Sequence, residues 1–391
     1  TMKVCDLTQF YSPVSGGVKR YISEKISWMH RARPGDRHIL IIPGEKTACR
    51  EEGLSRVYTI ASPLVSRTAR YRALLNLAAI EDILEMERPD VIESGDPYQI
   101  AWKALASGAA LGIPVIGFYH SHFPEAYLRS VDKFFGPIAV EIARDVARRY
   151  VRELYNRFAS TIVPSPALRS LLEQWGVRNT QLGELGVDTE IFRPSPSASE
   201  RDEVCRALGI DSGQLLLLYI GRLSLEKNVR TMFEAFRLLA QGTDRNRFAL
   251  LVTGDGPERK HFAELRESCP HAHWLPYQGD NQQLARLYRA ADLFVHPGVQ
   301  ETFGLVALES QASGTPVVGI RGSYMDRIIL TDQKHWAAEN SPTALAEAIR
   351  SMGARNLAAE GADAAKRVRE FYSWDTVFAR LFAVYEGVRR K

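Results

Sequence analysis

The sequence has few of the features that mark membrane-spanning, disulfide-rich or zinc-binding proteins. No apolar run approaches the roughly 20 residues that a membrane-spanning helix needs. The amino terminus enters a strand-like segment and shows no signal-peptide pattern. The four cysteines, Cys5, Cys49, Cys205 and Cys269, lack C-x-x-C spacing, which argues against a disulfide framework or a zinc site. We therefore expect a cytoplasmic protein, whose contact with the inner face of a membrane is peripheral if it occurs.

A strong charge of either sign is also missing, because 50 Lys and Arg side chains oppose 46 Asp and Glu side chains. The formal net charge of +4 is too small to bind nucleic acid through bulk electrostatics, so no nucleic-acid partner is expected. What is present is the composition of a soluble globular protein, 45% hydrophobic and 25% charged. Because 391 residues exceed what one compact core usually supports, we expect two domains.

Short apolar runs alternate with amphipathic stretches, a pattern that predicts an α/β fold with parallel sheets and crossover helices. The strands expected in the first half span residues 4–7, 38–42, 91–93, 114–119 and 161–164. Those expected in the second half span residues 215–221, 248–254, 292–296 and 316–320. A polar stretch with two prolines at 192–200 separates the halves, so the boundary is placed between residues 192 and 193.

Two glycines, Gly16 and Gly17, follow the first expected strand and open a helix. A helix amino terminus attracts anions, and glycine lets a phosphate approach the backbone closely. The same pair would equally suit a tight turn that binds nothing, so both interpretations stay open.

Two cations, Arg222 and Lys227, lie in the loop after the strand that begins the second half. Both can reach one diphosphate, where a preorganised cation is worth ~3 to 4 kcal/mol to a reaction that develops negative charge. The alternative is a solvated loop that carries a surface charge cluster at Glu226 and Lys227.

Two carboxylates, Glu301 and Glu309, flank the start of an apolar helix. A carboxylate on the buried side of a helix is costly without partners, and ribose hydroxyls would satisfy Glu309. The backbone amides of Gly304, Leu305 and Val306 lie at the helix amino terminus, where the helix dipole favours a phosphate. The alternative is an exposed Glu309 on an otherwise buried helix.

These elements, in this order, resemble glycosyltransferase family four. The resemblance rests on the Gly-Gly loop, the Gly-Arg to Lys element at 221–227 and the PG-x-x-E-x-FG-x-x-x-x-E frame at 297–309. Gly186-Val187-Asp188 and Ser165 match as well. The resemblance implies the GT-B fold, in which two Rossmann-like domains face a central cleft, here an acceptor domain at 1–192 and a nucleotide-sugar domain at 193–372. It further implies that the last helix, at 373–391, returns to the first domain.

The resemblance also implies roles for the candidate residues. Arg222 and Lys227 would bind the donor diphosphate, and Glu309 would bind the ribose. Glu301, together with the backbone of residues 303–306, would bind the transferred hexose. His120 would lie near the sugar, and it ends an expected strand, where a side chain can project into a ligand crevice. A core or surface histidine is the alternative.

The chemistry expected from the resemblance is retaining, metal-independent transfer of a hexose to a lipid or glycan hydroxyl. No cofactor is expected beyond the nucleotide-sugar co-substrate, and no metal, because no D-x-D element ends a strand. GDP-mannose is the favoured donor, because residues 118–124 and 186–189 look like those of members that transfer mannose or sulfoquinovose to lipids. A UDP-sugar donor, a nucleotide-sugar epimerase, a glycosyl phosphorylase and a noncatalytic sensor remain alternatives.

Two departures from the family pattern concern the sugar and acceptor. The usual Gly-Gly-x-x-Glu stretch is replaced by residues 321–327, in which Asp326 stands for the glutamate. Glu184 and Leu185 stand where the family usually has an asparagine before Gly186. The nucleotide site is not affected by either change.

A helical segment at 140–158 carries Arg144, Arg148 and Arg152 at intervals of four residues, with Arg149 and Arg157 nearby. Such a face can contact anionic lipid headgroups, which would suit a lipid acceptor. The alternative is a solvated face whose arginines pair with nearby carboxylates. These carboxylates are Glu141, Asp145 and Glu153.

Overall fold

The computed structural model describes residues 1–11, 17–65, 70–120, 135–183, 185–195, 197–300 and 304–390, together with residues 124 and 128. The chain forms two units, one of Thr1–Leu185 with Trp374–Lys391 and one of Gly186–Ser373. Each unit is built on its own sheet, of eight strands in the first and five in the second, so the expected α/β class is confirmed. None of the helices among these residues is both long and apolar enough to cross a membrane.

The first unit is an eight-stranded sheet in the order β3-β4-β2-β1-β5-β6-β7-β8. Its strands are β1 (Lys3–Leu7), β2 (Arg37–Gly44), β3 (Ala48–Glu52), β4 (Ser55–Ala61), β5 (Val91–Ser94), β6 (Val115–Phe118), β7 (Ser160–Val163) and β8 (Thr180–Leu182). Its helices are α1 (Gly17–Ala32), α2 (Leu77–Glu87), α3 (Gln99–Leu111), α5 (Pro137–Tyr155), α6 (Pro166–Gln174) and α14 (Trp374–Arg389). All neighbours are parallel except β3 and β4, and the strand order reverses between β1 and β5.

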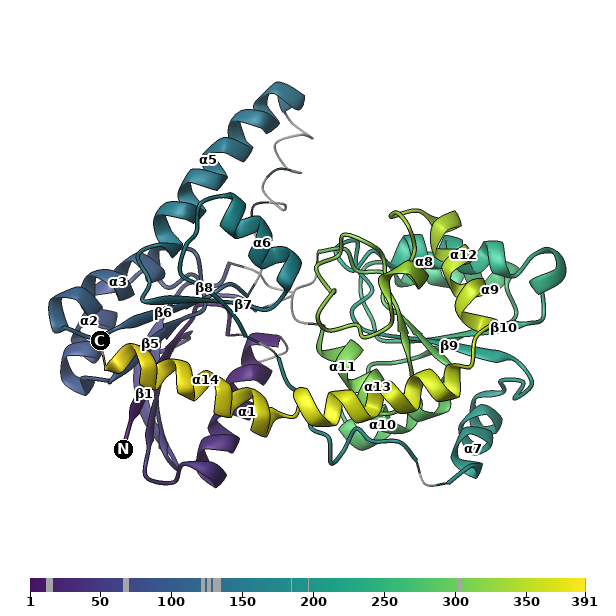
Figure 1. Cartoon of the computed structure of the whole chain (residues 1–391), viewed down its shortest axis with the longest axis horizontal. Coiled ribbons are helices and arrows are strands. Elements are labelled where there is room, and N and C mark those ends of the chain that lie inside the picture. The colour runs from purple at the N-terminus through teal and green to yellow at the C-terminus, as the bar shows by residue number, and fades with distance from the viewer. Residues whose placement is uncertain are drawn as a thin grey trace. The chain divides into compact units, whose positions relative to one another are not determined.

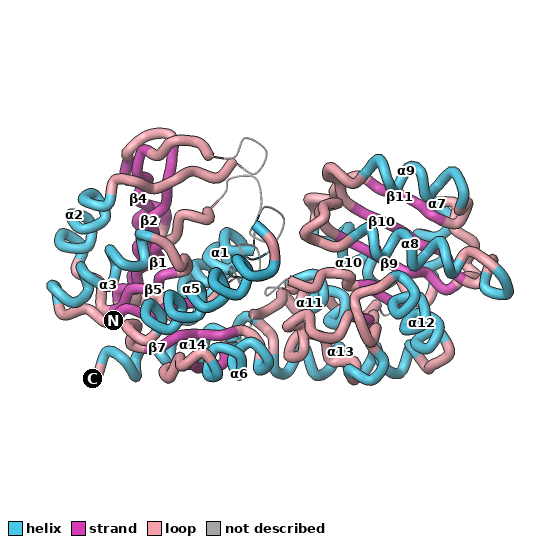
Figure 2. The backbone as a smooth tube through the Cα atoms, turned by 90° about the horizontal axis from the view of Figure 1, so that it is seen from above, coloured by secondary structure: helices cyan, strands magenta, loops and turns pink. Residues whose placement is uncertain are grey.

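The second unit is a five-stranded parallel sheet in the order β11-β10-β9-β12-β13. Figure 2 shows β11, β10 and β9 side by side. Its strands are β9 (Leu215–Ile220), β10 (Phe248–Thr253), β11 (Ala272–Leu275), β12 (Leu293–Val295) and β13 (Val317–Val318). Its helices are α7 (Ser199–Leu208), α8 (Val229–Leu239), α9 (Arg259–Ser268), α10 (Asn281–Ala290), α11 (Leu305–Ala312), α12 (Pro342–Gly353) and α13 (Leu357–Phe371), with short 3₁₀ turns η1 (Gly242–Asp244) and η2 (Gln333–His335). Helices α8, α9 and α12 cover one face and α7, α10, α11 and α13 the other (Figure 1).

The expected strands all form, whereas β3, β4, β8 and β11 were not expected. Every residue of β3 is exposed and β8 has only three residues, so neither contains an apolar run. In β11 a histidine interrupts the apolar pattern, and only the first of the four residues is buried. Period-based reasoning misses edge strands of this kind. The strand β4 is different, because it lies between β3 and β2 and four of its seven residues are buried, yet no expected strand covers it.

The boundary between the units lies at 185/186, which corrects the expected boundary at 192/193. Val187 forms a parallel bridge with Ser373, and its N–H donates to the Tyr372 carbonyl at 2.9 Å. The ring of Phe192 packs edge-on against that of Tyr288, at 5.9 Å between centroids. The polar stretch at 192–200 therefore follows a segment that already belongs to the second unit.

Helix α14 packs on α1 within the first unit. Its Phe378 and Phe382 rings lie against Trp28, with centroids 5.9 and 5.0 Å apart. On α1 the buried residues recur on one helix face, as packing against a neighbouring helix requires. That face includes Lys25, whose side chain is completely buried.

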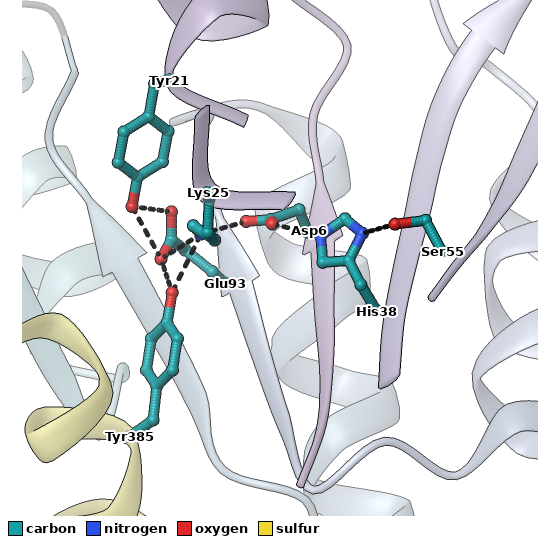
Figure 3. A network of polar contacts seen from close by, with 7 residues as sticks. All are labelled: Asp6, Tyr21, Lys25, His38, Ser55, Glu93 and Tyr385. Carbon is teal, nitrogen blue, oxygen red and sulfur yellow. Dashed lines mark hydrogen bonds and ion pairs between the residues drawn. The ribbon is translucent and has the colours of Figure 1, made fainter. Parts of the chain in front are cut away.

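Lys25 lies at the centre of a buried polar network shown in Figure 3. Its ammonium contacts a carboxylate oxygen of Asp6 at 2.8 Å, one of Glu93 at 3.1 Å and the Tyr385 hydroxyl of α14 at 3.0 Å. The Tyr21 hydroxyl donates to the Glu93 carboxylate at 3.0 Å. The Tyr385 hydroxyl donates to the same carboxylate. The network thereby joins α1, β1, β5 and α14.

The two carboxylates of the network have opposite pKa shifts. Burial alone raises the pKa of Asp6, but the Lys25 ammonium and a 2.7 Å contact with His38 lower it to about 2. Burial raises the pKa of Glu93 above its usual range, against the attraction of Lys25. The pKa of Lys25 is raised, because the two carboxylates outweigh the burial that lowers it. An ammonium with two carboxylates in the core is stable only while all the partners are present.

Candidate active site

The loop after β9 holds the two predicted diphosphate ligands, Arg222 and Lys227. The Tyr219 hydroxyl donates to the Arg222 carbonyl at 2.9 Å, and the Leu223 N–H donates to the Asp255 carbonyl at 2.9 Å. These bonds fix the loop backbone, while the Arg222 side chain is exposed and the Lys227 side chain is half-buried. Both cations thus project from a braced loop at the carboxyl edge of the sheet.

Two glycines after β10 allow this bracing, and sequence reasoning did not identify them. A Cβ atom on Gly254 would lie 2.0 Å from the Gly221 carbonyl oxygen, and one on Gly256 would lie 2.3 Å from the Leu223 carbonyl oxygen. Only glycine permits so close a backbone approach. The Gly-Asp-Gly-Pro sequence directly after an expected strand was the available signal.

Asn228 joins the loop after β9 to the loop after β12. It adopts the left-handed conformation, with φ of 56°, that precedes α8. Its side-chain amide donates to the Pro297 carbonyl at 2.9 Å and to the Asn340 side chain at 2.8 Å. Because β9 and β12 are neighbours at the point where the strand order reverses, these loops border the ligand crevice of such a sheet. Sequence reasoning missed Asn228 as well.

Helix α11 begins at the predicted anion-binding residues. Gly304 caps the helix with φ of 52°, and a Cβ atom there would lie 2.0 Å from the Met325 Cε. Leu305 and Val306 form the first turn and are half-buried. Amides of a first turn have no acceptor inside the helix, so they suit an external anion.

Glu309 lies on the buried side of α11, with 2% of its surface exposed. One carboxylate oxygen accepts a hydrogen bond of 2.8 Å from the Tyr288 hydroxyl of α10. The exposed alternative for this residue is therefore wrong. Tyr288 is itself fully buried and had not been identified from the sequence.

The remaining glycine and glutamate candidates are only partly covered by the structure. Gly17 is the first residue of α1 and is half-buried. Gly16 and Glu301 lie outside the described residues. Their roles stay predictions.

In the first unit, His120 follows β6 and is buried. Its ring stacks on Phe118, with centroids 4.0 Å apart and planes 6° apart, and meets the Tyr21 ring edge-on at 5.6 Å. Burial, with a smaller contribution from the Lys25 charge, lowers the pKa of His120 to about 3. At neutral pH this imidazole is uncharged, so it can donate or accept a hydrogen bond but adds no positive charge.

A buried carboxyl, Asp96, lies at the same edge of the sheet and was not predicted. It accepts hydrogen bonds from the Gln9 N–H at 2.7 Å and the Thr8 hydroxyl at 3.3 Å. Burial raises the pKa of Asp96 to about 7 despite these donors. A Cβ atom on Gly95 would lie 3.0 Å from the His120 ring, so Gly95 lets the ring lie against the backbone beside Asp96.

Two Rossmann-like units with polar side chains at their strand ends are the architecture of the GT-B class. The model of the family described as Glycosyltransferase Family 4 matches residues 15–191, and that of Glycosyl transferases group 1 matches residues 200–368. The chain belongs to the family-four glycosyltransferases and is a hexosyltransferase.

Two curated relatives illustrate the range of activities among similar proteins. A GDP-mannose-dependent alpha-(1-6)-phosphatidylinositol dimannoside mannosyltransferase of Mycobacterium tuberculosis (strain ATCC 25177 / H37Ra) is 29% identical over 390 residues, which cover 98% of this chain and 95% of the relative. An alpha-monoglucosyldiacylglycerol synthase of Streptococcus pneumoniae (strain ATCC BAA-255 / R6) is 26% identical over 332 residues, which cover 84% of this chain and 73% of the relative.

A solved structure supports the fold. Sucrose-phosphate synthase from Thermosynechococcus elongatus superposes with a TM-score of 0.76 at 19% identity, over 99% of each chain. At this identity the likeness concerns the fold alone. The expected GT-B architecture is confirmed.

Proposed function

We propose that the protein transfers mannose from GDP-mannose to a hydroxyl of a lipid or glycan, with retention of the anomeric configuration and without a metal. The observation that carries the proposal is the set of groups around one switch point of the second sheet. Exposed Arg222 and half-buried Lys227 follow β9, and α11 begins with the first-turn amides of Leu305 and Val306 and contains the buried Glu309. Cations and helix amides suit a pyrophosphate, and a buried carboxylate suits ribose hydroxyls.

The proposed reaction breaks the bond between the sugar C1 and the diphosphate oxygen while the acceptor oxygen bonds to C1 from the same face. The acceptor proton passes to an oxygen of the departing diphosphate, so no protein base is needed. Arg222 and Lys227 stabilise the negative charge that develops on the diphosphate. His120, uncharged near neutral pH, would hydrogen-bond the transferred sugar.

The donor is inferred from a relative that is named as GDP-mannose-dependent and that is similar to this chain along most of its length. A UDP-sugar is the second candidate, because other relatives are named for glucosyl and sulfoquinovosyl products. The acceptor class follows from the same names, in which phosphatidylinositol dimannoside and diacylglycerol are lipids.

A thermal-shift screen against GDP-mannose, UDP-glucose and the free nucleotides tests the donor. A ligand at 100 times its dissociation constant should stabilise the native state by about 2.7 kcal/mol, so the preferred nucleotide will raise Tm most. We expect GDP and GDP-mannose to do so, and Glu309→Gln, which keeps shape but loses charge, to reduce the shift. A larger shift with UDP-glucose would make the UDP-sugar alternative correct. Binding without glycosylated product across mannosylated and plain lipid acceptors would favour a noncatalytic sensor.

Metal independence is tested by removing divalent cations. Because two protein cations already lie in the loop that faces the proposed diphosphate, turnover in excess EDTA is expected to equal turnover without it. Product formation from radiolabelled donor gives the measurement. Loss of turnover in EDTA, with recovery on adding Mn²⁺, would contradict this part of the proposal.

A further inference from the structure

The His120 ring is held by contacts on three sides. Its face stacks on the Phe118 ring, with centroids 4.0 Å apart. The Tyr21 ring of α1 meets both members of this stack edge-on, with centroids 5.3 Å from Phe118 and 5.6 Å from His120. The backbone of Gly95 closes a third side, because a Cβ atom there would lie 3.0 Å from the imidazole. The orientation of the imidazole therefore depends on the position of the Tyr21 ring.

The Tyr21 ring is itself fixed through its hydroxyl. This hydroxyl donates to the Glu93 carboxylate at 3.0 Å, and both side chains are buried. Burial raises the pKa of Tyr21 well above its usual range, so the hydroxyl keeps its proton and stays a donor. Aromatic contacts are satisfied over a range of centroid distances, whereas a hydrogen bond fixes the position of its donor closely. The bond to Glu93 therefore fixes the Tyr21 ring against the imidazole.

The Glu93 carboxylate is held in turn by α14. The Tyr385 hydroxyl donates to it, and Figure 3 shows the Tyr21 and Tyr385 hydroxyls meeting at this one carboxylate. Lys25 contacts the same carboxylate at 3.1 Å and the Tyr385 hydroxyl at 3.0 Å. A second residue of α14, Phe378, packs on the Tyr21 ring with centroids 5.8 Å apart. Two side chains of α14 thus act on Tyr21, one directly and one through Glu93.

The buried network also acts on the imidazole through its charges. Burial is the main cause that lowers the pKa of His120 to about 3, the Lys25 ammonium lowers it further, and the Asp6 carboxylate opposes both. A charge shifts a pKa in this way only where it lies close enough to interact through the protein interior. The imidazole therefore shares both packing and electrostatics with the network that α14 completes.

We propose that Tyr21 and Tyr385 are positioning residues for the transfer reaction, which together hold the His120 imidazole in the orientation that hydrogen-bonds the transferred sugar. Neither tyrosine has to touch the substrate, since both act through Glu93 and the ring contacts. The last helix of the chain thereby acts on the candidate active site of the first unit from inside its core. This inference rests on the proposed function, in which His120 faces the sugar, and it adds two buried residues to that function.

Removing either hydroxyl is expected to lower kcat about tenfold with little change in the donor KM, because a small displacement of a group at the reacting centre is costly. Tyr21→Phe and Tyr385→Phe keep the rings, so the loss reports the hydrogen bonds to Glu93. Initial rates with radiolabelled GDP-mannose give both constants. Tyr58→Phe is the matched control, because Tyr58 is a buried tyrosine of the same unit whose hydroxyl donates to the buried Glu87 carboxylate at 2.5 Å. It should turn over at the wild-type rate.

A double-mutant cycle separates positioning from a general loss of structure. In the His120→Ala background, Tyr21→Phe should lower kcat by less than about twofold, because the imidazole that it positions is gone. The same holds for Tyr385→Phe. A purely structural role would lower the rate equally in both backgrounds, and that outcome would overturn the inference.

A second measurement needs no turnover. In protein labelled with ¹⁵N-histidine, the His120 resonances are identified by their loss in His120→Ala, and they report the tautomer and surroundings of the imidazole. We expect them to shift in Tyr21→Phe and in Tyr385→Phe but not in Tyr58→Phe. Unmoved resonances would overturn the inference and leave the proposed function standing. Shifted resonances in a protein that transfers no sugar would mean that the network positions His120 and that the proposed transfer is what fails.

Discussion

Replacing Lys227 with alanine is expected to lower kcat by about a hundredfold to a thousandfold, because the departing diphosphate loses a preorganised cation. The side chain is half-buried on a loop whose backbone is fixed from both ends, by Tyr219 and by Asn228. The donor KM should change much less than kcat, since the charge that Lys227 stabilises develops mainly as the sugar bond breaks. Initial rates with radiolabelled GDP-mannose give both constants.

Lys366→Ala is the control for this variant, because Lys366 is an exposed lysine on α13. It should have wild-type kinetics. Lys227→Arg keeps the positive charge and should recover part of the lost rate, which a purely structural role would not predict. If Lys227→Ala bound the donor normally and turned over at the wild-type rate, the leaving-group role would be wrong.

Replacing Lys25 with methionine is expected to destabilise the protein by about 3 to 5 kcal/mol, because two buried carboxylates lose their shared counter-charge. Asp6 and Glu93 are both buried and both contact the Lys25 ammonium, at 2.8 and 3.1 Å. Methionine fills similar space, so the loss reports charge and hydrogen bonding more than volume. Urea unfolding followed by far-ultraviolet circular dichroism measures the effect.

Two further variants separate the causes of this loss. Lys103→Met removes a lysine that pairs with the half-exposed Glu81, and a surface pair of this kind should cost less than about 1 kcal/mol. Combining Lys25→Met with Asp6→Asn and Glu93→Gln removes the unpaired charges and should recover much of the stability. A single Lys25→Met variant as stable as the wild type would show that the network does not stabilise the fold.

The sheets and the main loops of the candidate site could be predicted because they depend on local pattern. Apolar runs mark buried strands, and the carboxyl ends of neighbouring parallel strands meet at one edge. By that rule the loop with Arg222 and Lys227 and the loop before α11 lie at one sheet edge, since β9 and β12 are adjacent. The burial of Glu309 followed from the apolar residues around it on one helix.

The parts that could not be predicted depend on contacts between distant segments. Lys25 has the spacing of a core residue on α1 but the chemistry of a surface residue, and its partners lie on β1, β5 and α14. Asn228 matters because its backbone is left-handed and its amide reaches Pro297, neither of which a single sequence displays. On α5, Ile138, Ile142 and Val146 have the periodicity of a buried helix face, and only the structure shows that all three are exposed.

The return of α14 to the first unit makes that unit discontinuous in sequence, whereas the second unit is one unbroken stretch. During synthesis, residues 186–373 leave the ribosome before Tyr385 can close the contacts of Lys25 and Glu93. The domain at the amino terminus is therefore the last to be completed. Its buried carboxylates and the Lys25 ammonium lack the Tyr385 hydroxyl until the carboxyl-terminal helix has been synthesised. Chaperone dependence of this protein should accordingly concentrate on its amino-terminal half.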